Sequence, residues 1–184
     1  MITATILKDN FTLSNTIGVN FVFGVKGIDR TGDNPWDSEF VGKPIFDPNF
    51  NVSCLRCQTF LLEFCEQLRQ QDFIVKDSEW CWVEKFSEFV EKFNKRLPLN
   101  DEDFYDMVDK FRNWTYDGIM ADKWKSMGFI NGTIKYVEFY AETNLSKRSP
   151  SEIKMPEYLK WEDFTSFQRD KAPAELKSLF QTSG

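Results

Sequence analysis

The segment Val19–Val25 reads VNFVFGV, and apolar side chains occupy every second position in it. A period of two is typical of a β-strand, because successive side chains of a strand point to opposite faces of the sheet. A second strand is predicted over Gly132–Thr143, which reads GTIKYVEFYAET and alternates in the same way. The chain is therefore predicted to contain a sheet, with these two segments as its clearest strands.

Four other segments have apolar residues at helical spacing. Ser53 is the predicted N-cap of the first helix, and Pro98 is predicted to end the second. The predicted helices are Leu55–Gln71, about Trp82–Leu97, Asp101–Asn113 and about Pro156–Asp170. The side chains predicted to face the core from the second and fourth helices are Phe86, Phe89 and Phe93, and Tyr158, Trp161, Phe164 and Phe167.

This order of elements predicts an α+β fold, namely a ferredoxin-like split β-α-β sandwich with a helical insertion at about residues 80–128. Residues 1–184 are predicted to form a single domain, since a chain of 184 residues fits one compact core. Asp29–Pro48 is rich in Gly, Pro, Asp and Asn and is a predicted surface connection. This topology also leads us to expect a strand after Ser183, and that strand is missing. We therefore expect the chain to be an excised fragment, or its final strand to come from elsewhere in the chain.

Composition excludes several classes of function. The formal net charge of −6 argues against a partner that is a nucleic acid or an anionic membrane. The chain has no histidine, which excludes His-based triads and His-containing zinc sites. It also lacks a run of about 18 apolar residues, the minimum for a transmembrane helix. We find no convergent acid, base and nucleophile, so no catalytic residue and no cofactor is predicted.

The four cysteines are Cys54, Cys57, Cys65 and Cys81, and they admit three disulfide pairings. Cys54 and Cys57 have the spacing of a redox motif at a helix start, where a thiol pKa is lowered. A zinc site made from all four residues is a second alternative. Structural disulfides are a third, and a Cys65–Cys81 bond would close a loop of about 15 residues and contribute about 3 kcal/mol.

Five Asn-x-Ser/Thr sequons occur in the chain, where its composition would give about one or two by chance. This motif accepts N-linked glycans only in secreted or luminal proteins, on surface loops. The predicted glycosylation sites are Asn10, Asn51, Asn113, Asn131 and Asn144.

Several segments, taken in order, resemble a large extracellular loop of the Patched/Dispatched branch of the RND transporter superfamily. Phe23-Gly24-Val25 and Phe46–Asn51 lead into Gln58–Cys65, and the similarity continues through the segments Cys81–Phe86, Ile130–Ile134 and Trp161–Ser183. It spans most of the chain from about Val19 and is most like the second of the two loops of Dispatched proteins.

The resemblance implies a porter-type domain on the extracellular or luminal side of a membrane, between the helices of a multi-pass transporter. Dispatched proteins help release lipid-modified Hedgehog ligands, and their relatives move sterols or other lipids. The implied role is therefore non-catalytic support of lipid or sterol export, or of ligand release. The implied partners are the rest of the transporter, meaning its other extracellular domain and its membrane helices, and a lipid, sterol or lipid-modified protein.

The resemblance also bears on single residues. Family members carry cysteines at the positions of Cys65 and Cys81, which implies that these two are paired. Cys54 and Cys57 depart from the family pattern and are either a second pair or free. Aromatic side chains are abundant, with 19 Phe. Most are expected in the core, and those expected to line a lipid path or a partner surface are Trp36, Trp80, Trp114 and Trp124.

Two other classes of protein fit the sequence. One is a secreted or cell-surface module that binds a protein partner through its loops and has no transport role. The other is a cytosolic thiol enzyme or zinc protein that uses Cys54 and Cys57.

Overall fold

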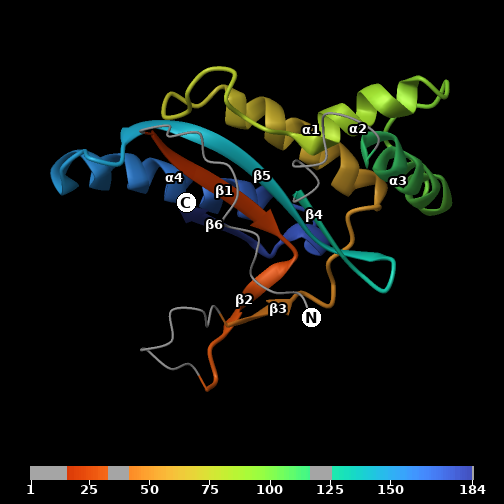
Figure 1. Cartoon of the computed structure of the whole chain (residues 1–184), viewed down its shortest axis with the longest axis horizontal. Helices are drawn as coiled ribbons and strands as arrows, with labels where there is room; N and C mark the ends of the chain where they lie inside the picture. The colour runs from red at the N-terminus through yellow and green to blue at the C-terminus, as the bar shows by residue number, and fades with distance from the viewer. Residues whose placement is uncertain (1–15, 33–41, 117–125, 184) are drawn as a thin grey trace.

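The computed structural model describes residues 16–32, 42–116 and 126–183 (Figure 1). These residues form strands, four α-helices and a short 3-10 helix. In chain order they are β1 (Thr16–Phe23), β2 (Val25–Asp29), β3 (Lys43–Phe46), α1 (Leu55–Arg69), α2 (Trp82–Glu91), α3 (Asp101–Tyr116), β4 (Met127–Ile130), β5 (Thr133–Ser146), α4 (Ser151–Lys171), the 3-10 turn Ala174–Leu176 and β6 (Leu179–Ser183).

The main sheet has the strand order β4-β5-β1-β6, and every neighbouring pair is antiparallel. Phe21 of β1 stands opposite Phe139 of β5 on one side and Gln181 of β6 on the other. Along the chain, helix α1 follows β3, and helix α4 lies between β5 and β6. The α+β class is confirmed, and both predicted strands lie at the centre of the sheet. The finer ferredoxin-like assignment stays a prediction, as does the single domain with its insertion.

The expectation that the last strand is missing was wrong. Residues Leu179–Ser183 form β6, which pairs with β1 from Val19 to Phe23. The segment is only five residues long and has no clear alternation. Its strand conformation is therefore decided by the free edge of β1, which offers backbone hydrogen bonds along its length.

Helices α1 and α4 cover the same face of the main sheet (Figure 1). Phe64 of α1 lies at the centre of this layer, with its ring centroid 5.2 Å from that of Phe139 and 5.3 Å from that of Phe23. Phe164 of α4 lies 5.6 Å from both Phe64 and Phe21. Much of the surplus of phenylalanine is therefore used to join the helices to the sheet, as expected for an aromatic core.

Helices α2 and α3 extend this core at one end of the sheet. Trp82 of α2 contacts Phe139 of the sheet at a ring distance of 6.2 Å. Phe86 packs between Phe104 and Phe111 of α3, at 5.4 Å from each. Among the described helices, none is long and apolar enough to cross a membrane.

Two predicted details of the first two helices were wrong. The N-cap of α1 is Cys54 rather than Ser53, because Ser53 is buried and its hydroxyl is bonded to Asn51. Helix α2 ends at Glu91, six residues before the predicted end. Asn94 has a φ of 56°, in the left-handed region where helices commonly terminate. Phe93 therefore lies outside the helix and is 45 % exposed, not in the core.

Helix α4 begins at Ser151, so Pro156 lies inside it rather than at its start. Its buried face consists of Trp161, Phe164, Thr165 and Gln168, which follow the spacing i, i+3, i+4, i+7. Tyr158 and Phe167 lie to the sides of this face and are exposed, so their predicted inward orientation was wrong.

The predicted strand Val19–Val25 is interrupted at Gly24, whose φ of 97° suits glycine. Beyond this break, β2 pairs with β3 in a separate two-stranded ribbon, and β3 lies within the segment Asp29–Pro48 that was predicted to be a surface connection. The edge strand β4 was not predicted, because its four residues are held by pairing with β5 rather than by a pattern of their own.

Candidate functional site

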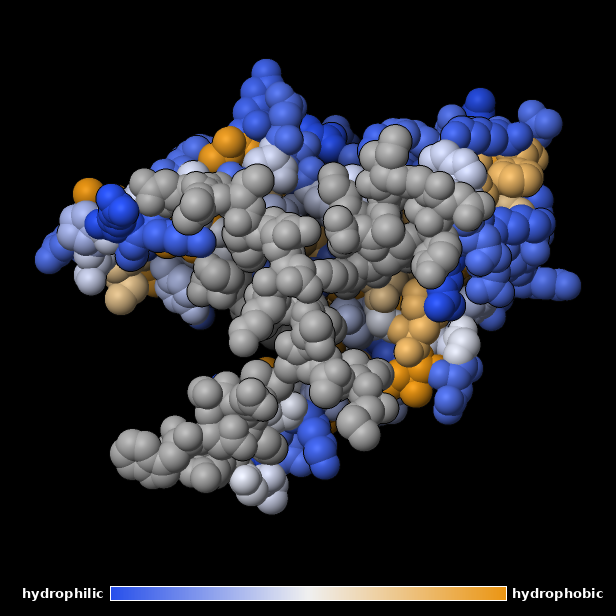
Figure 2. Space-filling view, in the orientation of Figure 1, coloured by the Kyte–Doolittle hydropathy of each residue, from blue (hydrophilic) through white to orange (hydrophobic). Residues whose placement is uncertain are grey.

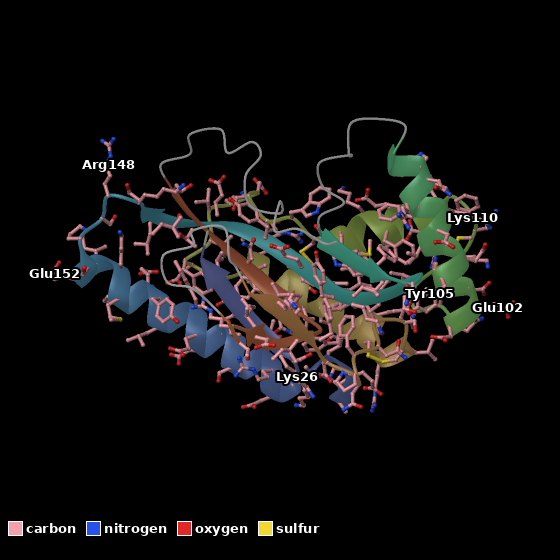
Figure 3. All side chains as sticks on the ribbon, turned by 60° about the horizontal axis from the view of Figure 1, so that its bottom comes forward. Lys26, Glu102, Tyr105, Lys110, Arg148 and Glu152 are labelled. Carbon is pink, nitrogen blue, oxygen red and sulfur yellow. A yellow bond between two sulfur atoms is a disulfide. The ribbon has the colours of Figure 1, made fainter. Side chains whose placement is uncertain are left out.

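The structure pairs the cysteines as Cys54–Cys57 and Cys65–Cys81, and all four lie within the described residues. The two bonds are seen beside α1 in Figure 3. The first lies at the start of α1, where the Sγ of Cys54 accepts the N–H of Cys57 at 3.1 Å. The second joins the middle of α1 to the residue before α2, and both of its cysteines are buried. It therefore fixes α2 against the main core.

This pairing bears on the redox and zinc alternatives. The Sγ atoms of Cys54 and Cys57 lie within 4.8 Å of a carboxylate oxygen of Glu175, which is an arrangement of metal-ligating atom types. A disulfide sulfur is not a thiolate, however, and only the thiolate binds a metal or attacks a substrate. The carboxylate of Glu175 accepts two hydrogen bonds from Nη2 of Arg56, at 2.7 and 2.9 Å, and these hydrogen bonds lower its pKa. While the Cys54–Cys57 disulfide is intact, Cys54, Cys57 and Glu175 therefore have a structural role and do not form a thiolate redox or zinc site.

Four of the five sequons lie within the described residues, and Asn10 lies outside them. Asn113, on the last turns of α3, and Asn131, in the turn between β4 and β5, are exposed. Asn144, near the end of β5, is also exposed, and its Nδ2 donates to the carbonyl oxygen of Asp72 at 2.7 Å.

Asn51 differs from these three asparagines. It is partly buried, and its Oδ1 accepts hydrogen bonds from the N–H and the hydroxyl of Ser53, at 3.0 and 2.6 Å. Ser53 is the hydroxyl residue of the same sequon, and it is buried next to Asp101. A glycan at this position therefore has less room than one at Asn113, Asn131 or Asn144.

Two of the four tryptophans predicted to contact a lipid or partner lie within the described residues, while Trp36 and Trp124 lie outside them. Trp80 is partly buried at the edge of the sheet, and its Nε1 donates to Ser126 at 3.0 Å. Trp114 is 49 % exposed, stacks on Phe111 and contacts Phe89 at a tilted angle, while the Nζ of Lys92 lies 4.2 Å from its ring centroid.

Trp114 and the exposed Phe93 both contact Phe89, whose ring centroid is 5.3 Å from that of Trp114 and 5.0 Å from that of Phe93. We call these two exposed residues, with Phe89 beneath them, the α2–α3 aromatic patch. In the view of Figure 2, hydrophobic colour on the described residues lies in several separate areas, with a continuous one at the lower right of centre. At the surface of α3 itself, Glu102 and Lys110 point outward in Figure 3.

The sheet face opposite α1 and α4 carries a carboxyl group. Glu138 of β5 lies between Tyr136 and Tyr140 on this face, with Val22 of β1 opposite it. Burial raises the pKa of Glu138 to about 7. The same desolvation raises the pKa of both tyrosines. A carboxyl group in this position titrates close to neutral pH. The alternating sequence pattern identified the strand, but it did not reveal the raised pKa of Glu138.

A cleft of about 550 Å³ lies between the C-terminal end of α1 and helix α4. Phe73 and Phe164, both buried, are among its lining residues. The polar residues that line it include Gln67, Gln71, Asp72, Lys160, Asp163 and Gln168. Sequence reasoning missed this cleft, because its walls are brought together only when α4 packs against α1.

Comparison with known proteins gives partial matches, and no protein-family model matches the chain. The chain is 30 % identical over 77 residues to protein dispatched homolog 1 of Homo sapiens, and 33 % identical over 85 residues to protein dispatched of Drosophila melanogaster. Part of the chain is similar to Dispatched proteins. The matched regions are 40 % and 46 % of this chain but 5 % and 7 % of the two relatives, so the chain corresponds to a small part of their length. These matches support a Dispatched-like relationship.

Proposed function

We propose that this chain is a non-catalytic domain on the extracellular or luminal side of a multi-pass, RND-type transporter of the Patched/Dispatched family. The observation that carries this proposal is the similarity to two Dispatched proteins. The two disulfides support it, since such bonds form and persist in oxidising compartments. The sequons at exposed Asn113, Asn131 and Asn144 agree with the same compartment.

In this role the domain acts by contact rather than by chemistry. Its partners are the other extracellular domain and the membrane helices of the same transporter, and its cargo is a lipid, a sterol or a lipid-modified protein. The α2–α3 aromatic patch supports this role, because exposed Trp and Phe side chains beside a lysine suit a partner that is apolar with a polar edge.

Glycopeptide mapping tests the compartment. The chain is secreted from eukaryotic cells behind a signal peptide, and each sequon is examined by mass spectrometry after trypsin digestion. We expect glycans at Asn113 and Asn131, and no free thiol on alkylation without reduction. Unmodified peptides at every sequon, together with four alkylated cysteines, would contradict the placement.

Binding to vesicles tests the contact role. Neutral phosphatidylcholine vesicles with and without cholesterol are titrated against the chain and against a Trp114→Gln, Phe93→Gln variant. We expect the variant to bind more than tenfold more weakly, because burying each of these side chains is worth about 2 kcal/mol and about 1.4 kcal/mol corresponds to a factor of ten. The matched control is Ile45→Gln, which changes an exposed apolar residue on the distant β2–β3 ribbon. Equal binding of all three proteins would remove the α2–α3 aromatic patch from the proposal.

A protein-binding module at the cell surface, without transport, is the second candidate. The same exposed Trp114 favours it, since tryptophan is enriched at protein interfaces. The complete gene distinguishes the two candidates: membrane helices encoded on both sides of this segment support the transporter, whereas their absence supports the module.

A further inference from the structure

The cleft between α1 and α4 contains a buried hydrogen-bonding atom that is not satisfied by the protein. Gln168 is only 1 % exposed, and its Nε2 donates to the Oε1 of Gln67 at 2.7 Å. Its own Oε1 has no hydrogen-bond partner among the described residues. Buried amide oxygens are nearly always paired, so this atom calls for a donor such as a hydroxyl or an amide N–H.

The charges of the cleft favour a neutral ligand. Asp72 and Asp163 line it together with Lys160 and Lys171, so the formal charges cancel. Lys160 is already engaged by Asp72 and Glu157, at 3.1 and 3.0 Å. The other polar lining groups are largely glutamine amides, which both donate and accept.

An exposed aromatic ring stands at the same cleft. Phe167 is 51 % exposed, and the Nζ of Lys171 lies 4.0 Å from its ring centroid. A sugar ring has an apolar C–H face that packs on aromatic rings and hydroxyl and amide groups that bond to side-chain amides. The volume of about 550 Å³ lies within the range of about 300–1,000 Å³ that is typical of small-molecule sites.

A source of such a sugar lies at one end of the cleft. The exposed Nδ2 of Asn144 is the atom that would bear an N-linked glycan, and it lies 2.7 Å from the carbonyl oxygen of Asp72. The turn after α1 runs beside this end of β5, where the N–H of Asn144 also donates to Phe73 (Figure 1). A glycosylated Nδ2 keeps one N–H, so the bond to Asp72 can persist while the first sugar lies beside the cleft.

We infer that the α1–α4 cleft binds the N-acetylglucosamine core of the N-linked glycan carried by Asn144. The sugars pack against Phe167 and form hydrogen bonds with the glutamine amides that line the cleft. This inference rests on the proposed extracellular or luminal placement, because only there is Asn144 glycosylated. The glycan then has a structural role, because it covers the contact between α1 and α4.

Enzymatic release of glycans from the folded, secreted chain tests the inference. Peptide N-glycosidase is added without denaturant, and the conversion of Asn to Asp is followed at each site by mass spectrometry. Asn131, in an exposed turn, is the internal control. We expect release at Asn144 to be about tenfold slower than at Asn131, which corresponds to about 1.4 kcal/mol of protection.

Two variants locate the protecting contact. Phe167→Ala should bring the release rate at Asn144 up to that at Asn131. Ile153→Ala, which changes another exposed apolar residue of α4 but not one of the cleft, should leave the slow rate unchanged. Equal release rates at Asn144 and Asn131 in the unmodified sequence, or slow release that persists in Phe167→Ala, would overturn the inference.

A soluble sugar tests the α1–α4 cleft separately from the glycan at Asn144. Ser146→Ala removes the sequon and keeps Asn144, and N,N′-diacetylchitobiose is titrated against this variant by NMR. We expect the side-chain amide signals of Gln67 and Gln168 to shift, and the shift to be lost on Phe167→Ala. If the probe binds but the secreted chain of unmodified sequence carries no glycan at Asn144, the source is overturned, and no binding of the probe would overturn the site. Absence of glycans at all sequons would instead overturn the proposed placement.

Discussion

Gln58 and Leu99 exchange two hydrogen bonds. The Nε2 of Gln58 donates to the carbonyl oxygen of Leu99 at 2.7 Å, and the N–H of Leu99 donates to the Oε1 of Gln58 at 2.8 Å. The same Nε2 donates to Ser53 at 2.5 Å, and Gln58 is 1 % exposed. One buried side chain of α1 therefore acts as a backbone mimic that fixes the segment leading into α3.

Replacement of Gln58 by leucine tests this junction. Gln58→Leu keeps the volume but leaves the N–H and the carbonyl of Leu99 without these partners. Because unpaired buried backbone groups are costly, we expect the free energy of unfolding to fall by about 2–4 kcal/mol. Urea denaturation followed by tryptophan fluorescence measures the change. The matched control is Gln70→Leu, since Gln70 is exposed at the end of α1 and should change stability by less than about 0.5 kcal/mol. A Gln58→Leu protein as stable as this control would contradict the role.

The two disulfides should differ in their contribution to stability. Cys65–Cys81 spans 16 positions and Cys54–Cys57 spans three, so the chain-entropy relation gives about 3 and about 2 kcal/mol. The longer loop also joins two buried cysteines, whose replacement leaves space in the core. We therefore expect Cys65→Ala/Cys81→Ala to lower the free energy of unfolding more than Cys54→Ala/Cys57→Ala. Parallel urea titrations of the two double variants decide the order, and the reverse order would be inconsistent with this assignment.

Glu138 should make stability depend on pH. Its pKa of about 7 in the folded protein lies above the ordinary value of 4.5, so the folded state holds a proton that the unfolded state has lost between these two values. The free energy of unfolding should therefore fall as pH rises from about 4.5 to 7, by about 1–3 kcal/mol.

Glu138→Gln isolates this effect. The glutamine cannot ionise, so the variant should match the original protein near pH 4.5 and exceed its stability at pH 8. Thermal unfolding measured at both pH values checks the prediction. Glu142→Gln, four residues along the same strand, removes another carboxyl group from the same face of the sheet and is the control. A Glu138→Gln protein with the same pH profile as the original would show that the carboxyl is not desolvated.

Occupancy of the sequons should follow their surroundings. We expect the fraction of glycosylated peptide to be higher at Asn131 than at Asn51. Asn131 stands in an exposed turn, whereas Asn51 is partly buried and bonded to Ser53 of its own sequon. Quantitative mass spectrometry of the secreted chain gives both fractions in a single sample. Full occupancy at Asn51 would mean that the glycan is transferred before the Asn51–Ser53 contact forms.

The sequence predicted a strand or helix correctly where the pattern that identifies it lies within the element itself. Alternation identified β1 and β5, and helical spacing identified α1, α2 and α3, because one face of each element is buried. It was uninformative where a partner decides the structure. Leu179–Ser183 becomes a strand only beside β1, and Phe93 leaves the core because Asn94 ends α2 early.

By itself, the sequence determined the α+β class, the elements with periodic apolar faces, and the residue types available for chemistry, including the absence of histidine. These properties depend on neighbours along the chain. Only the tertiary structure decided the strand conformation of Leu179–Ser183, the near-neutral pKa of Glu138 and the cleft between α1 and α4. Each of these depends on distance and desolvation between residues that are far apart in sequence, and those quantities are set only when the helices pack on the sheet.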